Sequence, residues 1–158
     1  MPGGAWPAPA RFVDFLSGDA MKIDREQIEA HARQRLQAEP YTSEPRGRLS
    51  DFKRFIKLET DRLRMRHRFG LGGLEIASAR SYQVDQVVTH ACRLALADAE
   101  PQARLALAGC AVVALGGYGR AEMAPQSDVD LLFLTPWKIT PWAESVIETM
   151  LYMLWDLM

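Results

Sequence analysis

The sequence of 158 residues contains little cysteine and no excess of charge of either sign. Cys92 and Cys110 are too few for a disulfide framework and lack the spacing of metal ligands, so we expect reduced, buried thiols in a cytoplasmic protein. The 19 basic and 20 acidic side chains leave a net charge of −1. This balance predicts no nucleic-acid partner.

Long hydrophobic runs are also absent. The longest uncharged stretch, residues 105–119, contains four glycines and is shorter than the roughly 20 residues of a membrane helix. The first 20 residues lack a basic start followed by an apolar core, so no signal peptide is predicted. We therefore expect a soluble, cytoplasmic protein without membrane contact. Its length and its 48% of hydrophobic residues fit one globular domain.

Proline and glycine divide the first fifty residues. Residues 1–20 are rich in Pro, Gly and Ala, and we expect them to form a flexible leader. Apolar side chains recur every four residues from Ile28, which predicts a helix that begins near Asp24 and stops before Pro40. Residues 40–48 have the composition of a linker.

Two longer helices are predicted next. Ser50 is the expected N-cap of the first, and the glycines within residues 70–73 end it. The second spans residues 74–99 and has a continuous apolar face. His90 lies on that face, where a histidine is more often structural than catalytic.

The helix that begins at Ser50 is rich in basic side chains, namely Lys53, Arg54, Lys57, Arg62, Arg64, Arg66 and Arg68. They could form a patch for an anionic partner or the solvated face of an amphipathic helix. We favour the solvated face, because Asp51, Glu59 and Asp61 partly balance the charge.

Strand patterns appear in the last third of the sequence. The short apolar run over residues 110–115 predicts a buried strand that ends in glycines. Residues 128–134 alternate and then become wholly apolar, which predicts a second strand. Residues 142–158 have a strongly apolar helical pattern. The predicted fold class is therefore α+β.

A glycine-rich turn follows the first predicted strand. Gly116 and Gly117 have no Cβ, so their backbone N–H groups can approach a phosphate closely, and a short helix after them would add a favourable dipole. A Gly-Gly pair alone is most often only a turn. Two common nucleotide motifs are excluded, since Arg120 stands where the Walker loop needs lysine and Glu122 stands where the dinucleotide fingerprint needs its third glycine.

Two carboxylates lie at the start of the second predicted strand. Asp128 and Asp130 are two residues apart, so strand periodicity places both on one face. Such close carboxylates repel each other unless a cation lies between them, and Mg²⁺ prefers oxygen ligands. Because the pair follows a glycine turn and precedes an apolar strand, the sequence predicts a metal site here.

Residues 116–122, followed by residues 127–131, resemble the signature of the polymerase-β-type nucleotidyltransferases. More narrowly, they resemble the bifunctional uridylyltransferase/uridylyl-removing enzymes of bacterial nitrogen control. Residues 135–142 and 151–157 are similar to the next segments of that family, and residues 50–99 are similar in pattern. The resemblance implies a helical N-terminal region followed by the start of a polymerase-β-like nucleotidyltransferase sheet with packed helices.

The resemblance also implies a division of the chain. Residues 1–48 would form a leader, a short helix and a linker, and residues 49–100 the helical N-terminal region. Residues 101–158 would be the first part of the nucleotidyltransferase domain. The family continues with an HD phosphohydrolase domain and two ACT domains, which this sequence does not contain. We therefore expect an N-terminal fragment of a longer enzyme or a truncated gene product.

The activity implied is transfer of UMP from UTP to a tyrosine hydroxyl of the PII signal protein, with release of diphosphate. Gly116 and Gly117 would hold the triphosphate through backbone N–H groups. Asp128 and Asp130 would ligate two Mg²⁺ ions as the metal-binding, catalytic residues. Ser127 would orient a carboxylate or touch a phosphate.

Arg120 has two possible roles under the resemblance. It would pair with Glu122 and brace the turn, or it would reach a phosphate.

One feature of the family is missing. Such sites use a third carboxylate from a later strand, whereas the acidic residues after Asp130 are Glu144, Glu148 and Asp156, all on one predicted helix. Two alternatives therefore stay open. One is a catalytically incompetent, nucleotide-binding or regulatory fragment. The other is a domain similar to the adenylyltransferase of glutamine synthetase, whose glycine turn usually carries a lysine.

Overall fold

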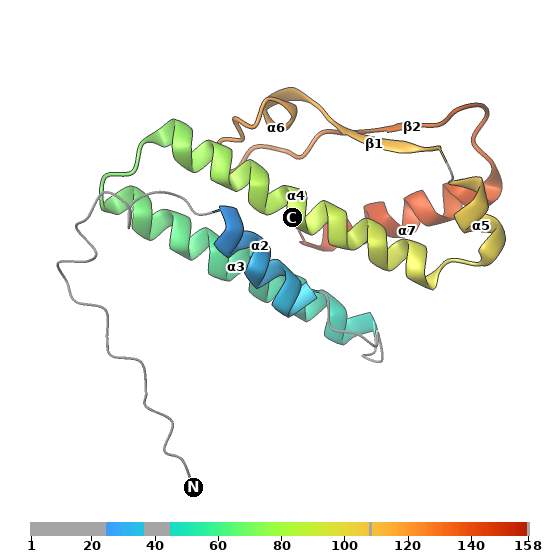
Figure 1. The fold of residues 1–158 in the computed structure, drawn as a ribbon, viewed down its shortest axis with the longest axis horizontal. Helices are drawn as coiled ribbons and strands as arrows, with labels where there is room; N and C mark the ends of the chain where they lie inside the picture. The colour runs from blue at the N-terminus through green and yellow to red at the C-terminus, as the bar shows by residue number, and fades with distance from the viewer. Residues whose placement is uncertain (1–24, 37–44, 108, 158) are drawn as a thin grey trace, which may run out of the picture.

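The structure is a computed structural model that describes residues 25–36, 45–107 and 109–157 (Figure 1). Its elements in chain order are α2 (Arg25–Leu36), α3 (Pro45–Arg68), α4 (Gly73–Asp98), α5 (Pro101–Ala106), β1 (Ala111–Ala114), α6 (Gly116–Gly119), β2 (Leu131–Leu134) and α7 (Pro141–Leu157). A two-stranded sheet lies along one side of a larger helical layer (Figure 1). The predicted α+β class is consistent with this arrangement.

Helix α2 packs on α3 and α4 through the apolar positions that its sequence repeats. Ile28, Ala32 and Leu36 are all buried, which confirms the predicted helix and its face. The carboxylate of Glu59 on α3 is buried beside this contact, where it accepts a hydrogen bond of 3.0 Å from Arg62 and lies 2.8 Å from Nδ1 of His31. These bonds satisfy a charge that would otherwise be costly to bury.

The start of α3 differs from the prediction. The helix begins at Pro45, so the end of the predicted linker is helical and Ser50 lies inside the helix instead of at its N-cap. Proline is well suited to a first helical turn, because its missing N–H has no partner there. The predicted end is confirmed, since α3 stops at Arg68 and Gly70 has a φ of 98°. The predicted leader lies outside the described residues.

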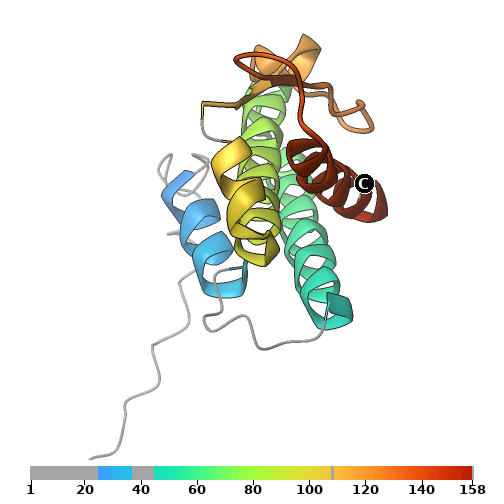
Figure 2. The same ribbon diagram turned by 90° about the vertical axis from the view of Figure 1, so that its right-hand side faces the viewer.

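Helix α4 is the central element of the helical layer. It contacts α2, α3 and α7, and Figure 2 shows it below the sheet, with α2 on one side and α7 on the other. Its buried face includes Val84, Val87 and Ala91, as the sequence predicted. His90 is also buried, and desolvation lowers its pKa, which agrees with a structural role. Gly72 caps the helix, where its N–H donates to Glu75 Oε2 at 3.1 Å.

Strands β1 and β2 form an antiparallel pair with Ala111 opposite Leu134 and Ala114 opposite Leu131. A further bond of 3.0 Å from the Leu115 N–H to the Asp130 carbonyl extends the pairing by one step. The expectation that β2 begins at Asp128 is wrong. The chain leaves β1 for α6 directly after Leu115, so Asp128 has no strand partner among the described residues.

The connection between the strands is fixed to α4 at two points. The Tyr118 hydroxyl donates to Asp85 Oδ1 at 2.8 Å, and the Met123 N–H donates to Ser81 Oγ at 3.1 Å. Ser81 and Asp85 are one helical turn apart on α4, so both bonds meet the same face. Tyr118 and Met123 are buried, and burial together with Asp85 raises the pKa of Tyr118. This attachment holds the glycine turn in place.

Helix α7 packs against α4 and α5. Its buried side chains are Ala143, Val146, Met150, Leu154 and Leu157, which confirms the predicted apolar helix. The short helix α5, which begins at Pro101, was not predicted. Both cysteines are free thiols and half-buried, so they are less enclosed than expected. No helix in the described part of the chain is long and apolar enough to span a bilayer.

Gly119 is required by the close approach of α6 to the end of β1. A Cβ built on Gly119 would lie 2.5 Å from the Ala114 carbonyl oxygen, whereas one on Gly73 would meet no atom within 4 Å. We expect Gly119→Ala to lower the free energy of unfolding by about 1–3 kcal/mol, as overpacking does. Gly73→Ala, the matched control, should change it by less than about 1 kcal/mol. Urea denaturation measures both, and equal stabilities would contradict this packing.

The outer face of the sheet is apolar and uncovered among the described residues. Leu115, Leu132 and Leu134 are between 42% and 49% exposed. Such a surface, next to unpaired strand edges, favours association. We expect the 158-residue chain to self-associate in sedimentation velocity, and Leu132→Lys to reduce association more than Leu74→Lys at the start of α4. Equal effects of the two substitutions would show that the sheet face is not responsible.

Candidate functional site

The glycine turn and one of the predicted metal ligands lie in direct contact. Gly116 has a φ of 58°, and a Cβ built on it would lie only 2.9 Å from Asp130 Oδ2. Any other residue there would be strained and would collide with the carboxylate. The bond from the Leu115 N–H to the Asp130 carbonyl sets this register. The fold therefore brings together two residues that are 14 positions apart in the sequence.

The backbone N–H groups of the turn lie at the start of α6. The first N–H groups of a helix have no carbonyl partner inside it, and the bonds that close this one are donated by Gly119 to Leu115 and by Arg120 to Gly116. A Cβ on Gly117 would lie 3.5 Å from the Glu122 carbonyl oxygen, an ordinary contact. The protein's own packing thus demands glycine at 116 but tolerates a methyl group at 117.

Asp128 lies on the same side of its segment as Asp130. Exposure alternates from Asp128 to Leu134, with Asp128, Asp130 and Leu132 exposed and the residues between them half-buried. This alternation is consistent with the predicted common face, although Asp128 and Asp130 precede β2 instead of belonging to it. Neither carboxylate forms an ion pair with a described residue.

Backbone strain is concentrated in this connection. Among the described residues other than glycine, positive φ occurs at Ala121, with 56°, and at Gln126, with 69°. The second lies next to Ser127, whose N–H donates to the Ala124 carbonyl at 3.1 Å. Strained conformations of this kind cost of order 1–3 kcal/mol and are often found at functional sites.

Arg120 and Glu122 form the ion pair that the sequence suggested. Arg120 Nε lies 3.3 Å from Glu122 Oε2, and both side chains are more than half exposed. An exposed pair of this kind contributes little to stability. The guanidinium therefore stays accessible to solvent beside the turn, and the geometry is compatible with both predicted roles of Arg120.

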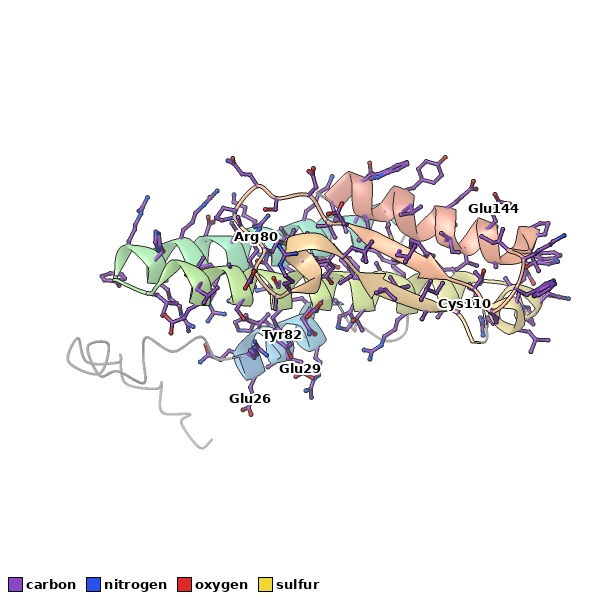
Figure 3. All side chains as sticks on the ribbon, turned by 90° about the horizontal axis from the view of Figure 1, so that it is seen from above. Glu26, Glu29, Arg80, Tyr82, Cys110 and Glu144 are labelled. Atoms are coloured by element: carbon purple, nitrogen blue, oxygen red, sulfur yellow. The ribbon has the colours of Figure 1, made fainter. Side chains whose placement is uncertain are left out.

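A third metal ligand is not assembled in the described part of the chain. No group of three or more His, Cys, Asp or Glu side chains is placed there to hold a metal ion. Glu144, Glu148 and Asp156 are exposed on α7. Figure 3 shows Glu144 toward the opposite end of the long axis from Arg80. Two carboxylates alone leave most of the coordination sphere of Mg²⁺ to water or substrate oxygens.

A cavity of about 900 Å³ opens beside Asp128. It lies between α3, α4, the C-terminal part of α7 and residues 125–129. Ser127 and Asp128 line one wall, and Arg64 and Arg80 belong to the helical walls. The volume lies within the range of sites for small molecules. Ser127 and Asp128, which the sequence predicted as site residues, thus border a cavity that the sequence did not predict.

Arg80 is the main residue that sequence reasoning missed. It lies on α4, and desolvation by burial, followed by the charge of Arg64, lowers its pKa (Figure 3). A signal was present in the sequence, because Arg80 falls four residues after Ile76 and four before Val84, both on the buried face of the helix. A charged residue at such a position is unusual unless it has a partner.

Sequence comparison relates the chain to one group of bacterial enzymes. It is 65% identical over 80 residues to the bifunctional uridylyltransferase/uridylyl-removing enzyme of Cereibacter sphaeroides, and 81% identical over 47 residues to the enzyme of that name from Ruegeria pomeroyi. A third enzyme of the same name, from Erythrobacter litoralis, is 50% identical over 86 residues.

These similarities cover part of each chain. The aligned segments are 50%, 30% and 54% of this chain and 9%, 5% and 9% of the three enzymes, respectively. The aligned part of the chain thus spans less than a tenth of the length of these relatives. No protein-family model matches it, and no solved structure matches it. Over these aligned segments, its homologues are therefore bifunctional uridylyltransferase/uridylyl-removing enzymes.

Proposed function

We propose that this chain is part of an enzyme that transfers UMP from UTP to a tyrosine of the PII signal protein and releases diphosphate. The observation that carries the proposal is the contact between Gly116 and Asp130, with Asp128 on the same side. The names of the homologues support the uridylyl group and make an adenylyltransferase the weaker alternative. The polymerase-β-type fold and the division at residues 48 and 100 belong to the same proposal.

The residues present fit a magnesium site. Asp128 and Asp130 are exposed, neighbouring carboxylates without a cationic partner among the described residues, and a divalent cation would relieve their repulsion. When bound, Mg²⁺ would supply charge stabilisation for the transferred phosphoryl group and for the leaving diphosphate.

The chain's own groups would then act around the triphosphate. Backbone N–H groups of Gly116 and Gly117 would donate hydrogen bonds to phosphate oxygens, as N–H groups at a helix start do. Ser127 would orient Asp128 or contact a phosphate. In the transfer, the tyrosine oxygen forms a bond to the α-phosphorus while the bond to the β-phosphate oxygen breaks, and the hydroxyl proton is released.

The 158-residue chain by itself has a different expected behaviour. Because the described residues assemble no third ligand, we propose that the chain alone is a nucleotide-binding piece that does not turn over. With UTP, Mg²⁺ and PII it should give no uridylylated PII by mass spectrometry. Turnover at the rate of an enzyme of the relatives' length would contradict this.

The carboxylates are tested in an enzyme of the relatives' length that contains this chain. We expect Asp128→Asn or Asp130→Asn to reduce UMP transfer at least about a hundredfold, because each removes a charged ligand at the reacting phosphates. Removal of UMP from PII should persist, because Asp128 and Asp130 are proposed to hold the metal for the transfer reaction alone. Mass spectrometry of PII follows both activities.

The matched control is Glu144→Gln, which removes a carboxylate from the exposed side of α7 and should leave transfer intact. Two outcomes would refute the assignment. One is parallel loss of transfer and removal in a folded Asp130→Asn enzyme, and the other is unchanged transfer in both aspartate variants.

A further inference from the structure

The cavity beside Asp128 is lined mainly by side chains of the hydrophobic core. Each of the four segments around it contributes apolar residues, among them Ile56, Val84, Leu131 and Leu154. His67 and Trp155 line it as well and are exposed, so the cavity is open to solvent at that side. Packed interiors contain few voids larger than a water molecule, whereas this one measures about 900 Å³.

Two polar side chains of α4 in this cavity lack partners. Arg80 and Gln83 are three residues apart, so they share one face of the helix. Arg80 is half-buried, its Nε has no hydrogen-bond partner, and it forms no ion pair with any described residue. Gln83 is 3% exposed, and its amide nitrogen donates to the Ile56 carbonyl at 3.0 Å, but its Oε1 has no partner. Nearly all buried polar atoms in folded proteins are paired, so an occupant that pairs these two fits the cavity.

The charge of the cavity favours an acidic occupant. Arg64, His67 and Arg80 line it together with a single carboxylate, Asp128. Arg64 already pairs with Asp61 at 3.3 Å, whereas Arg80 has no carboxylate of its own. Burial, followed by the charge of Arg64, disfavours the charged form of Arg80, and a carboxylate beside its guanidinium would offset both effects. The lining therefore matches apolar side chains that flank an Asp or a Glu.

The length of the relatives provides a source for such an occupant. The aligned segments are 9%, 5% and 9% of the three enzymes, so more than nine-tenths of each enzyme lies outside its aligned segment. A segment of the same polypeptide is present at a high effective concentration, which favours it over a separate partner in solution.

We propose that, in an enzyme of the relatives' length, a segment of the same polypeptide from outside these 158 residues fills the cavity and pairs a carboxylate with Arg80. The inference rests on the part of the proposed function that makes this chain a piece of a longer enzyme, and not on the reaction. A guanidinium and a carboxylate form two parallel hydrogen bonds, which fixes the register of the segment. A donor of the same segment would pair with Gln83 Oε1.

The occupied cavity would also support the candidate site. Ser127 and Asp128 form one of its walls, and Gln126 in that wall has the strained φ of 69°. A segment packed against this wall would hold Asp128 in place. The nucleotide keeps its position at the glycine turn, because neither the turn nor Asp130 lines the cavity.

The covering of the cavity is measured by the rate at which maleimide labels an introduced thiol, with the site identified by mass spectrometry. His67→Cys places the thiol in the cavity, and Arg68→Cys is the matched control, because both residues are exposed on α3 but only His67 lines the cavity. We expect labelling at position 67 to be at least about tenfold slower in the longer enzyme than in the 158-residue chain, and labelling at position 68 to change less than about threefold. Unchanged labelling at position 67, or equal protection of both positions, would overturn the inference.

The role of Arg80 is tested in the longer enzyme that carries His67→Cys. We expect Arg80→Gln to accelerate labelling about tenfold, which corresponds to the loss of one hydrogen bond between charged groups. The matched control is Arg93→Gln, which removes the same charge from an exposed position of α4 outside the cavity and should change the rate less than about twofold. If circular dichroism shows that Arg80→Gln unfolds, Arg80→Lys decides, because it keeps the charge but loses the bidentate geometry. A folded Arg80 variant that labels no faster than Arg93→Gln would refute the pairing.

A photo-cross-linker identifies the occupant. Trp155 lines the cavity and is 71% exposed, so p-benzoylphenylalanine replaces it in the longer enzyme with little change in packing. We expect a cross-link to a peptide of the same polypeptide that lies outside these 158 residues and contains Asp or Glu. A cross-link to a second copy, recognised by mixing ¹⁵N-labelled and unlabelled enzyme, or to none but these 158 residues, would overturn the inference.

Transfer of UMP is measured on the same enzyme, which separates this inference from the proposed function. Protection of the cavity in an enzyme that does not transfer UMP would count against the proposed function alone. Transfer by an enzyme in which the cavity stays accessible would refute this inference alone.

Discussion

The hydrogen bond from Tyr118 to Asp85 is the constraint on which the candidate site depends. The connection between β1 and β2 is long and contains two strained residues, so it needs an external support. Tyr118 supplies one by inserting its buried ring beside α4, and the Met123 N–H supplies another through Ser81. Because α4 is itself held between α2, α3 and α7, the glycine turn takes its position from the helical core. The contact between Gly116 and Asp130 follows from that position.

The sequence predicted much of this architecture because its signals were local. Four-residue spacing located α2, and glycine located the end of α3, since Gly70 adopts the left-handed conformation that a helix end favours. The apolar runs located both strands. Local signals failed where the outcome depended on distant partners. Ser50 has the chemistry of an N-cap, but the helix begins earlier, at Pro45. Asp128 has a strand pattern, but no strand in the described part of the chain pairs with it.

The candidate site was likewise predictable where its signals are local in the sequence and not where it depends on packing. The glycines and the aspartates were identified from residue type and spacing, and the fold brings Gly116 and Asp130 into contact. The cavity could not be predicted, because it is formed by side chains of four separated segments. The basic helix illustrates the difference. The predicted solvated face is confirmed, since Lys53, Arg54, Lys57, Arg64 and Arg68 are exposed, but Arg64 also lines the cavity that Arg80 lines. Only the packing of α3 on α4 reveals this.

The central claim is that the glycine turn and the aspartates form one site for a nucleotide and its metal. The most direct measurement is paramagnetic broadening of amide resonances in the ¹⁵N-labelled chain by Mn²⁺ in the presence of UTP. The account predicts that the amides of Gly116, Gly117, Ser127, Asp128 and Asp130 broaden first, whereas those of α5 stay sharp. Absence of broadening at the turn, or selective broadening near Glu144 and Glu148 on α7, would contradict it.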